Sequence, residues 1–333
     1  MNLLKVSGSP HVHTDNSVKN IMYGVIYAMI PAMLVSVYFF GLDALRVMVL
    51  SVVACLLVEY LLQKYVVKTD VTIWDGSAII TGILLAFNVP SNLPWWIILI
   101  GAIVSIGVAK TSFGGLGKNI FNPALVGRVF LLISFPVQMT SWPVPKPIGG
   151  TALTDAVTGP TPLGIMKEGL AAGQSVQEIM PEIPNYVQNL MTGFQGGSLG
   201  EVSAIALILG AIYMLYRKII TWHTPFAYLG SVVIFSGILW LVDPTQFVDP
   251  LFHLVTGGMI LGVFYMATDM VSSPMSTRGQ LVFGAGAGIL TILIRVFGAY
   301  PEGVSFAILI MNGFVPLIDR AFKPARFGEM VKS

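Results

Sequence analysis

The sequence predicts an all-α polytopic membrane protein with about ten transmembrane helices and cytoplasmic N- and C-termini. Three observations favour this fold class. Of 333 residues, 55% are hydrophobic and 10% are charged, and the mean hydropathy is +0.80. A soluble domain would carry about 25% charged residues. The apolar residues form long runs bounded by charge, proline and glycine, and basic residues concentrate in alternate connecting segments.

The composition also excludes several functional classes. A net charge of +2 provides no strongly basic surface for nucleic acid. The single cysteine, Cys55, lies in an apolar run, so a disulfide or a thiolate-bound cluster within this chain is not expected. Residues 1–19 lack the long apolar core of a cleavable signal peptide, so the first membrane helix is expected to direct insertion. No spacing of histidine or acidic residues resembles a zinc site, and we expect no metal.

Ten apolar runs are candidate spans, although several are shorter than the ~20 residues of a straight crossing. The runs cover residues 20–40, 45–63, 77–90, 93–109, 120–136, 201–216, 224–241, 251–268, 280–297 and 303–319. The shortest run, SAIITGILLAFNVP, contains Gly82 and ends at Asn88 and Pro90, which indicates a broken or half helix. Irregular backbone is tolerated at membrane depth only where protein or a cavity satisfies it.

The distribution of lysine and arginine gives the orientation. A cytoplasmic N-terminus places most of the 18 basic residues in cytoplasmic segments, whereas the outer segments keep only Arg46, Lys146 and Lys167. The predicted organisation is a leader (1–19), a first half of five spans (20–136), an extracytoplasmic loop (137–200), a second half of five spans (201–319) and a tail (320–333).

A weak internal repeat relates the two halves. TGILLAFNVP begins at Thr81, and TGGMILGVFYMATD begins at Thr256. In the predicted topology the two copies run in opposite senses, as in an inverted five-plus-five repeat with a polar site at the repeat interface. The alternative is chance similarity between glycine-rich apolar segments.

The stretch TDAVTGPTPLG, residues 154–164, lies in the longest polar interval. Gly159 and Pro160 favour a tight turn that would present Thr158 and Thr161 outward. Asp155 could accept hydrogen bonds from nearby backbone or help to bind a metal. An ordinary turn in an outer loop explains the same residue types.

The stretch SFGGLGKNIFNPALVGR, residues 112–128, is rich in glycine and enters a helix at Asn122-Pro123. A glycine-rich loop at a helix start can hold phosphate, so Gly114, Gly115, Asn119 and Asn122 are candidate cofactor-binding residues. The spacing is not that of a Walker A loop. Close helix packing through small residues is the other interpretation.

Several charged residues are candidates because charge at membrane depth is costly. Glu201, in GGSLGE, begins the sixth predicted span, where it either favours a helix N-terminus or faces an ion or flavin site. Glu59, Asp75 and Asp269 are candidates for ion translocation, and Asp269 also fits an acid that marks a helix end. The candidate arginines, Arg128 and Arg295, carry less weight because arginines near helix ends often extend to the interface.

Segments along nearly the whole chain carry a family resemblance. These segments are SGSPHVHTDNSVKNIM, WDGSAIITGILLAFNVP, GGLGKNIFNPALVGRVFLLISFP, GSLGE, MATDMVSSPMSTRGQL and IRVFGAYPEGVSFAILIMN. Together they resemble the D subunit of the Rnf complex, the bacterial ion-pumping ferredoxin:NAD oxidoreductase. The related B subunit of the sodium-pumping NADH:quinone oxidoreductase usually has a longer N-terminus, so the short leader favours the Rnf type.

The resemblance implies an FMN joined through its phosphate to a threonine. The family motif of Asp, two variable residues, Ser or Thr, Gly or Ser, Ala and Thr matches Asp155, Thr158, Gly159 and Thr161, which makes Thr161 the acceptor. Pro160 stands where the family usually has alanine. Because proline fixes φ and removes a backbone donor, it could prepare the segment for the flavin transferase or weaken recognition.

The resemblance further implies a redox subunit of a translocase in the bacterial cytoplasmic membrane. It would relay electrons through FMN at the outer face, while the complex couples ferredoxin:NAD electron transfer to export of Na⁺ or H⁺. The implied partners are the A, B, C, E and G types of Rnf subunit, a flavin transferase and the lipid bilayer. A second, non-covalent flavin such as riboflavin is implied by analogy.

Two other functions fit parts of the sequence. An inverted repeat with a broken helix also builds small-solute transporters and channels, which have no reason to carry a covalent flavin. A B-type subunit of a quinone reductase would carry the flavin, but its complex would need quinone rather than NAD. Modification of Thr161 would therefore distinguish the Rnf function from a transporter or channel. The electron acceptor, NAD or quinone, would distinguish it from a quinone reductase.

Overall fold

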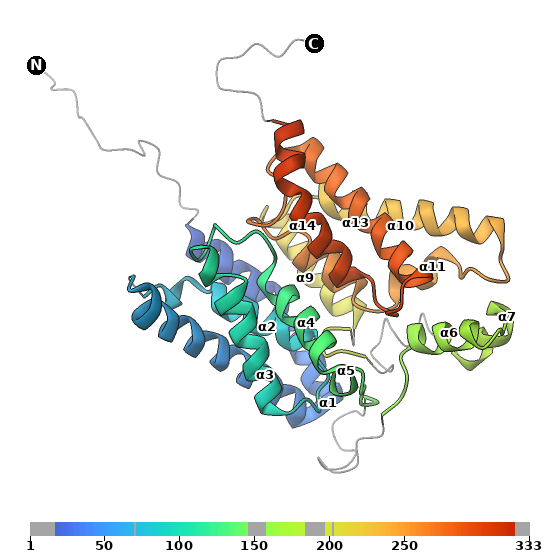
Figure 1. Cartoon of the computed structure of the whole chain (residues 1–333), viewed down its shortest axis with the longest axis horizontal. Helices are drawn as coiled ribbons and strands as arrows, with labels where there is room; N and C mark the ends of the chain where they lie inside the picture. Colours follow the sequence, from blue (N-terminus) through green and yellow to red (C-terminus); the bar gives the residue numbers. More distant parts are fainter. Residues whose placement is uncertain (1–16, 70, 146–157, 184–196, 202, 324–333) are drawn as a thin grey trace, which may run out of the picture.

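The computed structural model describes residues 17–69, 71–145, 158–183, 197–201 and 203–323. Within these ranges the regular secondary structure is helical (Figure 1). The one extended pairing in the described ranges is an isolated antiparallel bridge between Pro143 and Thr158. The all-α class expected from the apolar runs is therefore confirmed for this part of the chain.

Apolar helices occupy the region before the polar interval. They are α1 (Val18–Leu61) with a π-helical continuation (Leu62–Val67), α2 (Ser77–Phe87), α3 (Trp95–Ala102) with a π-helical continuation (Ile103–Val108), α4 (Pro123–Ser134) and the short α5 (Pro136–Met139). Gly41, at φ 61° and ψ −141°, divides α1 into two helical arms. The expected spans 20–40 and 45–63 are therefore the two arms of one element.

A short helical layer follows in the polar interval. It comprises α6 (Pro162–Ala171), α7 (Val176–Ile179) and a 3-10 turn (Met180–Glu182). Ile179 and Phe252 lie in a small core in which this layer packs against the second group of helices.

The second group of helices follows the polar interval. It contains α9 (Ala204–Tyr216), α10 (His223–Val242), α11 (Pro250–Val255), α12 (Met259–Leu261) with a π-helical continuation (Gly262–Met266), α13 (Thr277–Phe297) and α14 (Val304–Ala321). The predicted span 251–268 is not one continuous helix. The helix stops at Val255 and restarts at Met259, because the backbone around Gly257 (φ +67°) leaves the right-handed helical region.

The expected half helix at 77–90 is a short continuous helix, α2. Its 11 residues rise about 16 Å, roughly half of the ~30 Å hydrocarbon core. Asn88 ends the helix and donates from Nδ2 to the Leu84 carbonyl at 2.6 Å. Each group of helices thus contains interrupted or shortened elements.

The two groups lie side by side (Figure 1). They meet along α1, α9 and the π-helical segment Gly262–Met266. The Tyr265 hydroxyl donates to the Ala28 and Leu207 carbonyls at 3.2 and 2.9 Å. Gly200 N donates to the Phe87 carbonyl at 2.8 Å, which fixes the end of α2 against the segment before α9. These bonds hold both groups around one core.

Five helical segments are long and apolar enough to cross a membrane by length and composition. They are Val18–Val67, Trp95–Phe113, His223–Val242, Thr277–Phe297 and Val304–Ala321. Shorter apolar helices are Ser77–Phe87, Pro123–Ser134 and Ala204–Tyr216. Large apolar side chains remain exposed on the outside of the helices, for example Leu42, Leu241 and Leu317 at 71, 76 and 60% exposure. Such a surface fits contact with lipid.

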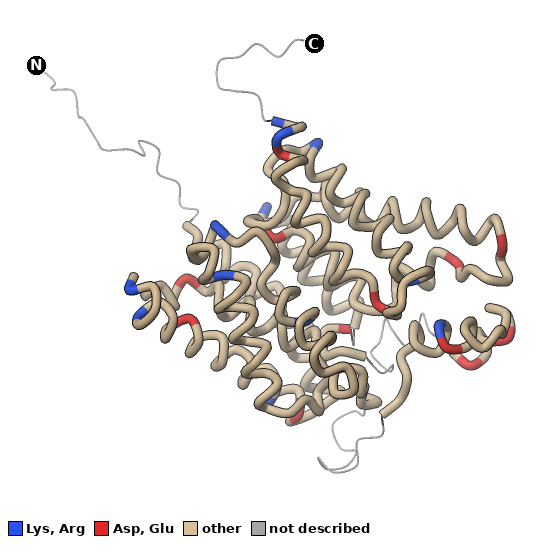
Figure 2. The backbone as a smooth tube through the Cα atoms, in the orientation of Figure 1, with Lys and Arg blue, Asp and Glu red and all other residues tan. Residues whose placement is uncertain are grey.

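Charged residues divide between the two ends of the helices. Figure 2 shows most basic segments on the side where α1 begins and α14 ends. The acidic segments gather mainly toward the opposite side, near α6 and α7 (Figure 2). The asymmetry matches the one inferred from the sequence for a membrane-embedded chain.

Gly82 should show how tightly α2 packs on α1. A Cβ at Gly82 would lie 2.6 Å from Val52 Cα, in the backbone of the neighbouring helix. We expect Gly82→Ala to destabilise the fold by about 1–3 kcal/mol, the usual cost of overpacking. The matched Gly230→Ala change meets nothing within 4 Å and should be neutral or stabilising by up to about 1 kcal/mol. Thermal unfolding in detergent would measure both, and equal midpoints would contradict the close approach.

Candidate functional site

Thr161 is the N-cap residue of α6. Its Oγ1 accepts a hydrogen bond from Gly164 N at 3.1 Å, and Pro162 occupies the first helical position. The side chain is 8% exposed. The expectation that Thr161 faces outward is therefore wrong, because the hydroxyl turns back to satisfy the first turn of the helix. The hydroxyl oxygen nevertheless lies at the positive end of a ten-residue helix.

The segment before Thr161 is extended, so the tight turn expected at Gly159-Pro160 is also wrong. Thr158 pairs with Pro143, and Gly159 N donates to the Trp142 carbonyl at 3.0 Å. This pairing straightens the chain before it enters α6. Thr158 is exposed, and Asp155, the other predicted motif residue, lies outside the described residues.

A buried arginine lies beside the start of α6. The two Nη atoms of Arg295 donate to the His253 and Thr256 carbonyls at 2.7 and 2.8 Å, at the C-terminal end of α11. A cation there satisfies carbonyls that the broken helix leaves free. A Cβ on Gly257 would lie 2.8 Å from Leu163 Cδ1 and 2.9 Å from Arg295 Nη2. The first turn of α6 and the guanidinium therefore meet at Gly257.

A second buried arginine lies on the other side of this break. Arg128 Nη1 donates to Asn88 Oδ1 at 2.9 Å and to Ser305 Oγ at 2.8 Å, and Arg128 Nη2 pairs with Glu302. Glu201 lies nearby, with its Oε1 3.4 Å from the position of a Cβ on Gly258. Glu201 does not begin a helix as expected, because α9 starts at Ala204, after Ser203.

Three buried polar atoms near the break have no hydrogen-bond partner within the described part of the chain. They are His253 Nδ1, Arg295 Nε and Glu201 Oε1. Unsatisfied buried groups are rare in native proteins, and a bound water or ligand is one explanation for them. Arg128 is neutralised by Glu302, so the groups suited to an anion are the helix N-terminus at Thr161 and the Arg295 guanidinium, whose Nε–H is unpaired among the described residues. These two groups fit the phosphate of a tethered flavin.

Lys167 holds α6 against the second group of helices. Its Nζ donates to the Gly298 carbonyl and, at 3.0 Å, to the Tyr300 carbonyl. Partial burial lowers the pKa of the Lys167 ammonium from its ordinary value. The contact fixes the position of Thr161 relative to α13.

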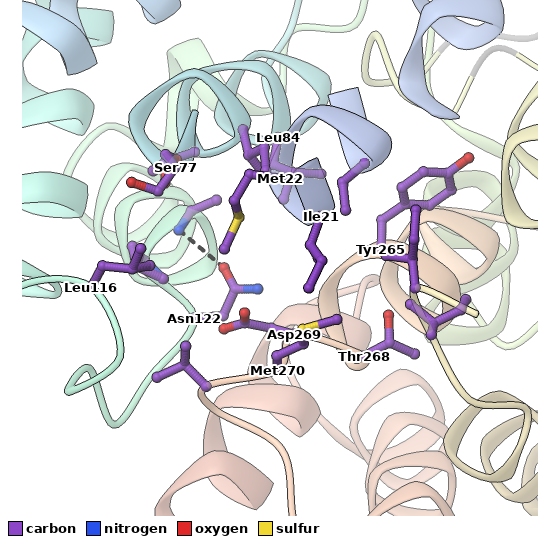
Figure 3. A pocket seen from close by; sticks show the side chains of 18 of the residues that line it. Ile21, Met22, Ser77, Leu84, Leu116, Asn122, Tyr265, Thr268, Asp269 and Met270 are labelled. Carbon is purple, nitrogen blue, oxygen red and sulfur yellow. Dashed lines mark hydrogen bonds between the residues drawn. The ribbon is translucent and has the colours of Figure 1, made fainter. Parts of the chain in front are cut away.

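A separate small cavity lies between the two groups of helices, away from Thr161 (Figure 3). Its volume is about 90 Å³, enough for a few water molecules. Figure 3 shows Ser77, Leu84 and Asn122 from the first group and Tyr265, Thr268 and Asp269 from the second. The polar lining also includes Thr81, Lys110 and Asn119.

One wall of this cavity carries a buried ion pair. Lys110 Nζ lies 2.7 and 2.9 Å from the two carboxylate oxygens of Glu59 and donates to Ser77 Oγ at 2.6 Å. Lys110 and Glu59 are each 2% exposed. Asp75 Oδ1 accepts from Ser77 N and Oγ at 2.8 and 2.6 Å and so supports the start of α2. The fold thus joins Glu59 and Asp75 in one network.

The facing wall carries the predicted asparagines and Asp269. Asn122 caps α4 through Oδ1, as expected from Asn122-Pro123, and donates from Nδ2 to the Met266 carbonyl at 3.2 Å. Asp269 accepts from Ser272 Oγ at 2.7 Å and lines the cavity with Asn119. Gly114 and Gly115 lie in the turn before α4 and do not line this cavity. The predicted loop therefore contributes its asparagines rather than these glycines.

Sequence reasoning assigns no site role to Lys110, His253 or Glu302. Each of these residues appears in the sequence only as a polar residue near the end of an apolar run. A lysine in such a position usually extends to solvent. No group of three or more histidine, cysteine or acidic side chains able to hold a metal occurs among the residues that were placed.

These features define a multi-span helical membrane protein with polar sites at interrupted helices. The family model described as NQR2, RnfD, RnfE matches residues 5–328, and the chain belongs to this family.

Named relatives cover almost the full chain. The D subunit of a proton-translocating ferredoxin:NAD(+) oxidoreductase complex from Clostridium ljungdahlii is 43% identical over 98% of this chain and 97% of its own length. The D subunit of the Na(+)-translocating complex from Acetobacterium woodii is 42% identical over 98% of this chain and 95% of its own. The D subunit of an ion-translocating oxidoreductase complex from Pectobacterium atrosepticum is 37% identical, with 98 and 99% coverage.

The buried ion pair gives a test of the cavity wall. Lys110→Met would leave the Glu59 carboxylate buried without its cation, and we expect a loss of about 3–5 kcal/mol in stability. The Glu59→Met/Lys110→Met double variant should recover much of that loss, since both charges are gone. Thermal unfolding in detergent of both single variants and the double variant completes the cycle. Additive losses would show that the two side chains do not interact.

Proposed function

We propose that this chain is the membrane redox subunit of an Rnf-type complex, carrying FMN on Thr161. The complex couples electron transfer between reduced ferredoxin and NAD⁺ to export of Na⁺ or H⁺. One observation carries the assignment of the site. The motif threonine lies at a helix N-terminus, and Leu163, two residues further on, lies beside Gly257 and close to the buried guanidinium of Arg295. The relatives named above support the assignment of the complex.

The chain's own residues would position the flavin in three ways. The α6 N-terminus stabilises the phosphoester, because its free N–H groups and dipole favour negative charge. Lys167 holds α6 in place through the Gly298 and Tyr300 carbonyls. Arg295 keeps a fixed positive charge beside Leu163. FMN, when bound, supplies one- or two-electron transfer. Because Thr161 is only 8% exposed, a flavin transferase would act before α6 packs or on an opened α6.

The proposal includes ten spans, with both termini in the cytoplasm of a bacterial cell. Gly41 divides the 50-residue segment Val18–Val67 into two helical arms, and these arms are taken as two crossings. The basic end seen in Figure 2 supports a cytoplasmic placement of the start of α1 and the end of α14. Thr161 then lies on the outer side. The shortened α2 and the broken α11–α12 support an inverted five-plus-five repeat.

Ion coupling is proposed to involve the cavity between the two groups of helices. Asp269 lines it, whereas Glu59 and Asp75 lie behind its lining residues Lys110 and Ser77. Its volume of about 90 Å³ suits water or a small cation. A carboxylate held by Lys110 can accept another cation only if the ammonium moves away. The proton-translocating and Na(+)-translocating relatives are 43 and 42% identical, so overall identity does not distinguish the ion.

A second, non-covalent flavin such as riboflavin is also part of the proposal. Asn119 and Asn122 offer amide groups that suit the polar edge of a flavin ring. A cavity of about 90 Å³ does not accommodate the ring, so binding there requires displacement of the facing segment 264–271. The proposed partners are the A, B, C, E and G types of Rnf subunit. Glu201 is assigned to the polar residues around Gly257 and Gly258 rather than to this second flavin.

Thr161→Val should abolish covalent flavin. Peptide mass spectrometry of the complex purified from its own host should find an FMN phosphoester on the peptide that contains Thr161. In Thr161→Val both this mass and the flavin fluorescence of the denatured band should disappear. Thr140→Val, at an exposed position outside the motif, is the matched control and should keep the flavin. An unmodified native peptide from a host with an active transferase would favour the transporter alternative.

The acceptor of electrons distinguishes the two redox alternatives. In membranes that contain the complete complex, we expect oxidation of reduced ferredoxin to depend on NAD⁺ and to stop in the Thr161→Val strain. Added quinone should not replace NAD⁺. Replacement by quinone at an equal rate would assign the chain to a quinone reductase instead.

Asn119→Leu should lower the content of non-covalent flavin. The substitution removes an amide from the cavity wall, so less riboflavin should be extracted by acid from the purified complex while the Thr161 peptide keeps its FMN mass. Asn92→Leu, at an exposed position outside this cavity, should leave both flavins unchanged. Unchanged extraction from Asn119→Leu would remove Asn119 from the proposed site.

A further inference from the structure

A second, larger cavity lies beside α6, close to Thr161. Its volume is about 650 Å³, and it lies between α6, the segment 245–253 and the end of α13. One face of α6, with Leu163, Met166 and Leu170 at spacings of three and four residues, forms one wall. The opposite wall includes Phe247 and Phe297. The cavity is therefore a mainly apolar space with aromatic sides.

Polar side chains also line the cavity. Lys167, Gln174, Ser175, Thr245 and Gln246 are at least partly exposed, whereas two polar lining residues are buried. His253 and Arg295 line the cavity, each is 5% exposed, and His253 Nδ1 and Arg295 Nε have no partner among the described residues. Both Nη atoms of Arg295 are engaged by backbone carbonyls, so the guanidinium is held in place and Nε–H is its remaining donor. A ligand for this space therefore has an apolar body and a polar, hydrogen-bonding edge.

We propose that this cavity binds the isoalloxazine ring of the flavin carried by Thr161, with Arg295 and His253 at the polar edge of the ring. The inference rests on the proposed function, since it needs the covalent FMN. A flavin ring has an apolar dimethylbenzene end and a polar pyrimidine end, which match the two parts of the lining. The cavity is also within reach of a group attached to Thr161. Leu163, in the first turn of α6, lines the cavity and lies beside Gly257, where Arg295 Nη2 also lies.

The placement has an electrostatic consequence. Reduction adds negative charge to the polar end of the ring, and a fixed cation beside it stabilises the reduced form. Burial between Phe247, Phe297 and the α6 face would also keep water-soluble quenchers from the ring. Arg295 is then a positioning and tuning residue for the flavin, in addition to its bonds to the end of α11.

Filling the cavity tests this placement without changing Arg295. Ala171 and Gln174 line the cavity and are exposed at its rim, so Ala171→Phe/Gln174→Phe should fold and narrow the space. Glu168→Phe, on the exposed side of the same helix, is the matched control. Phenylalanine is used because tryptophan or tyrosine would quench flavin fluorescence directly. The readout is iodide quenching of flavin fluorescence in the purified complex, with the Thr161→Val complex as the blank for other flavins.

The expected result is a several-fold larger iodide quenching constant in the filled variant, with the control equal to the native complex. Arg295→Met should in addition lower the midpoint potential of the covalent flavin, whereas Arg278→Met, at an exposed position on the basic side, should not. If the Thr161 peptide carries FMN but quenching is equal in all complexes, the ring lies elsewhere and the inference is wrong. If the peptide carries no FMN, the proposed function fails first, and mass spectrometry distinguishes the two cases.

Discussion

The structure depends on how its interrupted helices satisfy their backbone. A helix that stops inside a membrane leaves carbonyl groups that neither lipid nor water can bond. Arg295 bonds the carbonyls of His253 and Thr256 where α11 ends, and Asn88 closes α2 while its Oδ1 accepts from Arg128. The ends of α2 and α11 are thus each associated with a buried arginine.

The same constraint explains why the two candidate sites occur where they do. Thr161 lies beside the break at Gly257, and the small cavity lies where the π-helical segment Gly262–Met266 passes the start of α4. Unusual helical geometry of this kind often accompanies functional sites. In both places the backbone departs from a regular helix, and polar side chains from distant parts of the sequence fill the gap.

Much of the fold is predictable from local patterns. Apolar runs predict most of the helices, and Asn122-Pro123 marks the start of α4 because both residue types satisfy the first turn. The break at Gly257 escapes such patterns, since TGGMIL is as apolar as a continuous span. The burial of Thr161 escapes them as well, because the motif TGPT favours a turn locally, whereas pairing with residues 142–143 draws it straight.

The composition of the sites is harder to predict than their position. Lys110 and Glu59 are 51 residues apart, and only the packing of the helices shows that the lysine does not reach solvent. Arg295 and Leu163 are farther apart still, and their meeting at Gly257 depends on the unpredicted break. A motif identifies the residue that carries a cofactor, because that chemistry is local. The surroundings that tune a cofactor come from long-range packing, which a single sequence does not display.

One short segment links the two sites. Thr256, whose carbonyl bonds Arg295, and Asp269, which lines the small cavity, lie at the two ends of a broken helix and its π-helical continuation. Coupling between redox change and ion movement requires an element with two arrangements that both sites influence. Within the described chain, the segment from Thr256 to Asp269 contacts both sites, through the Thr256 carbonyl at one end and Asp269 at the other.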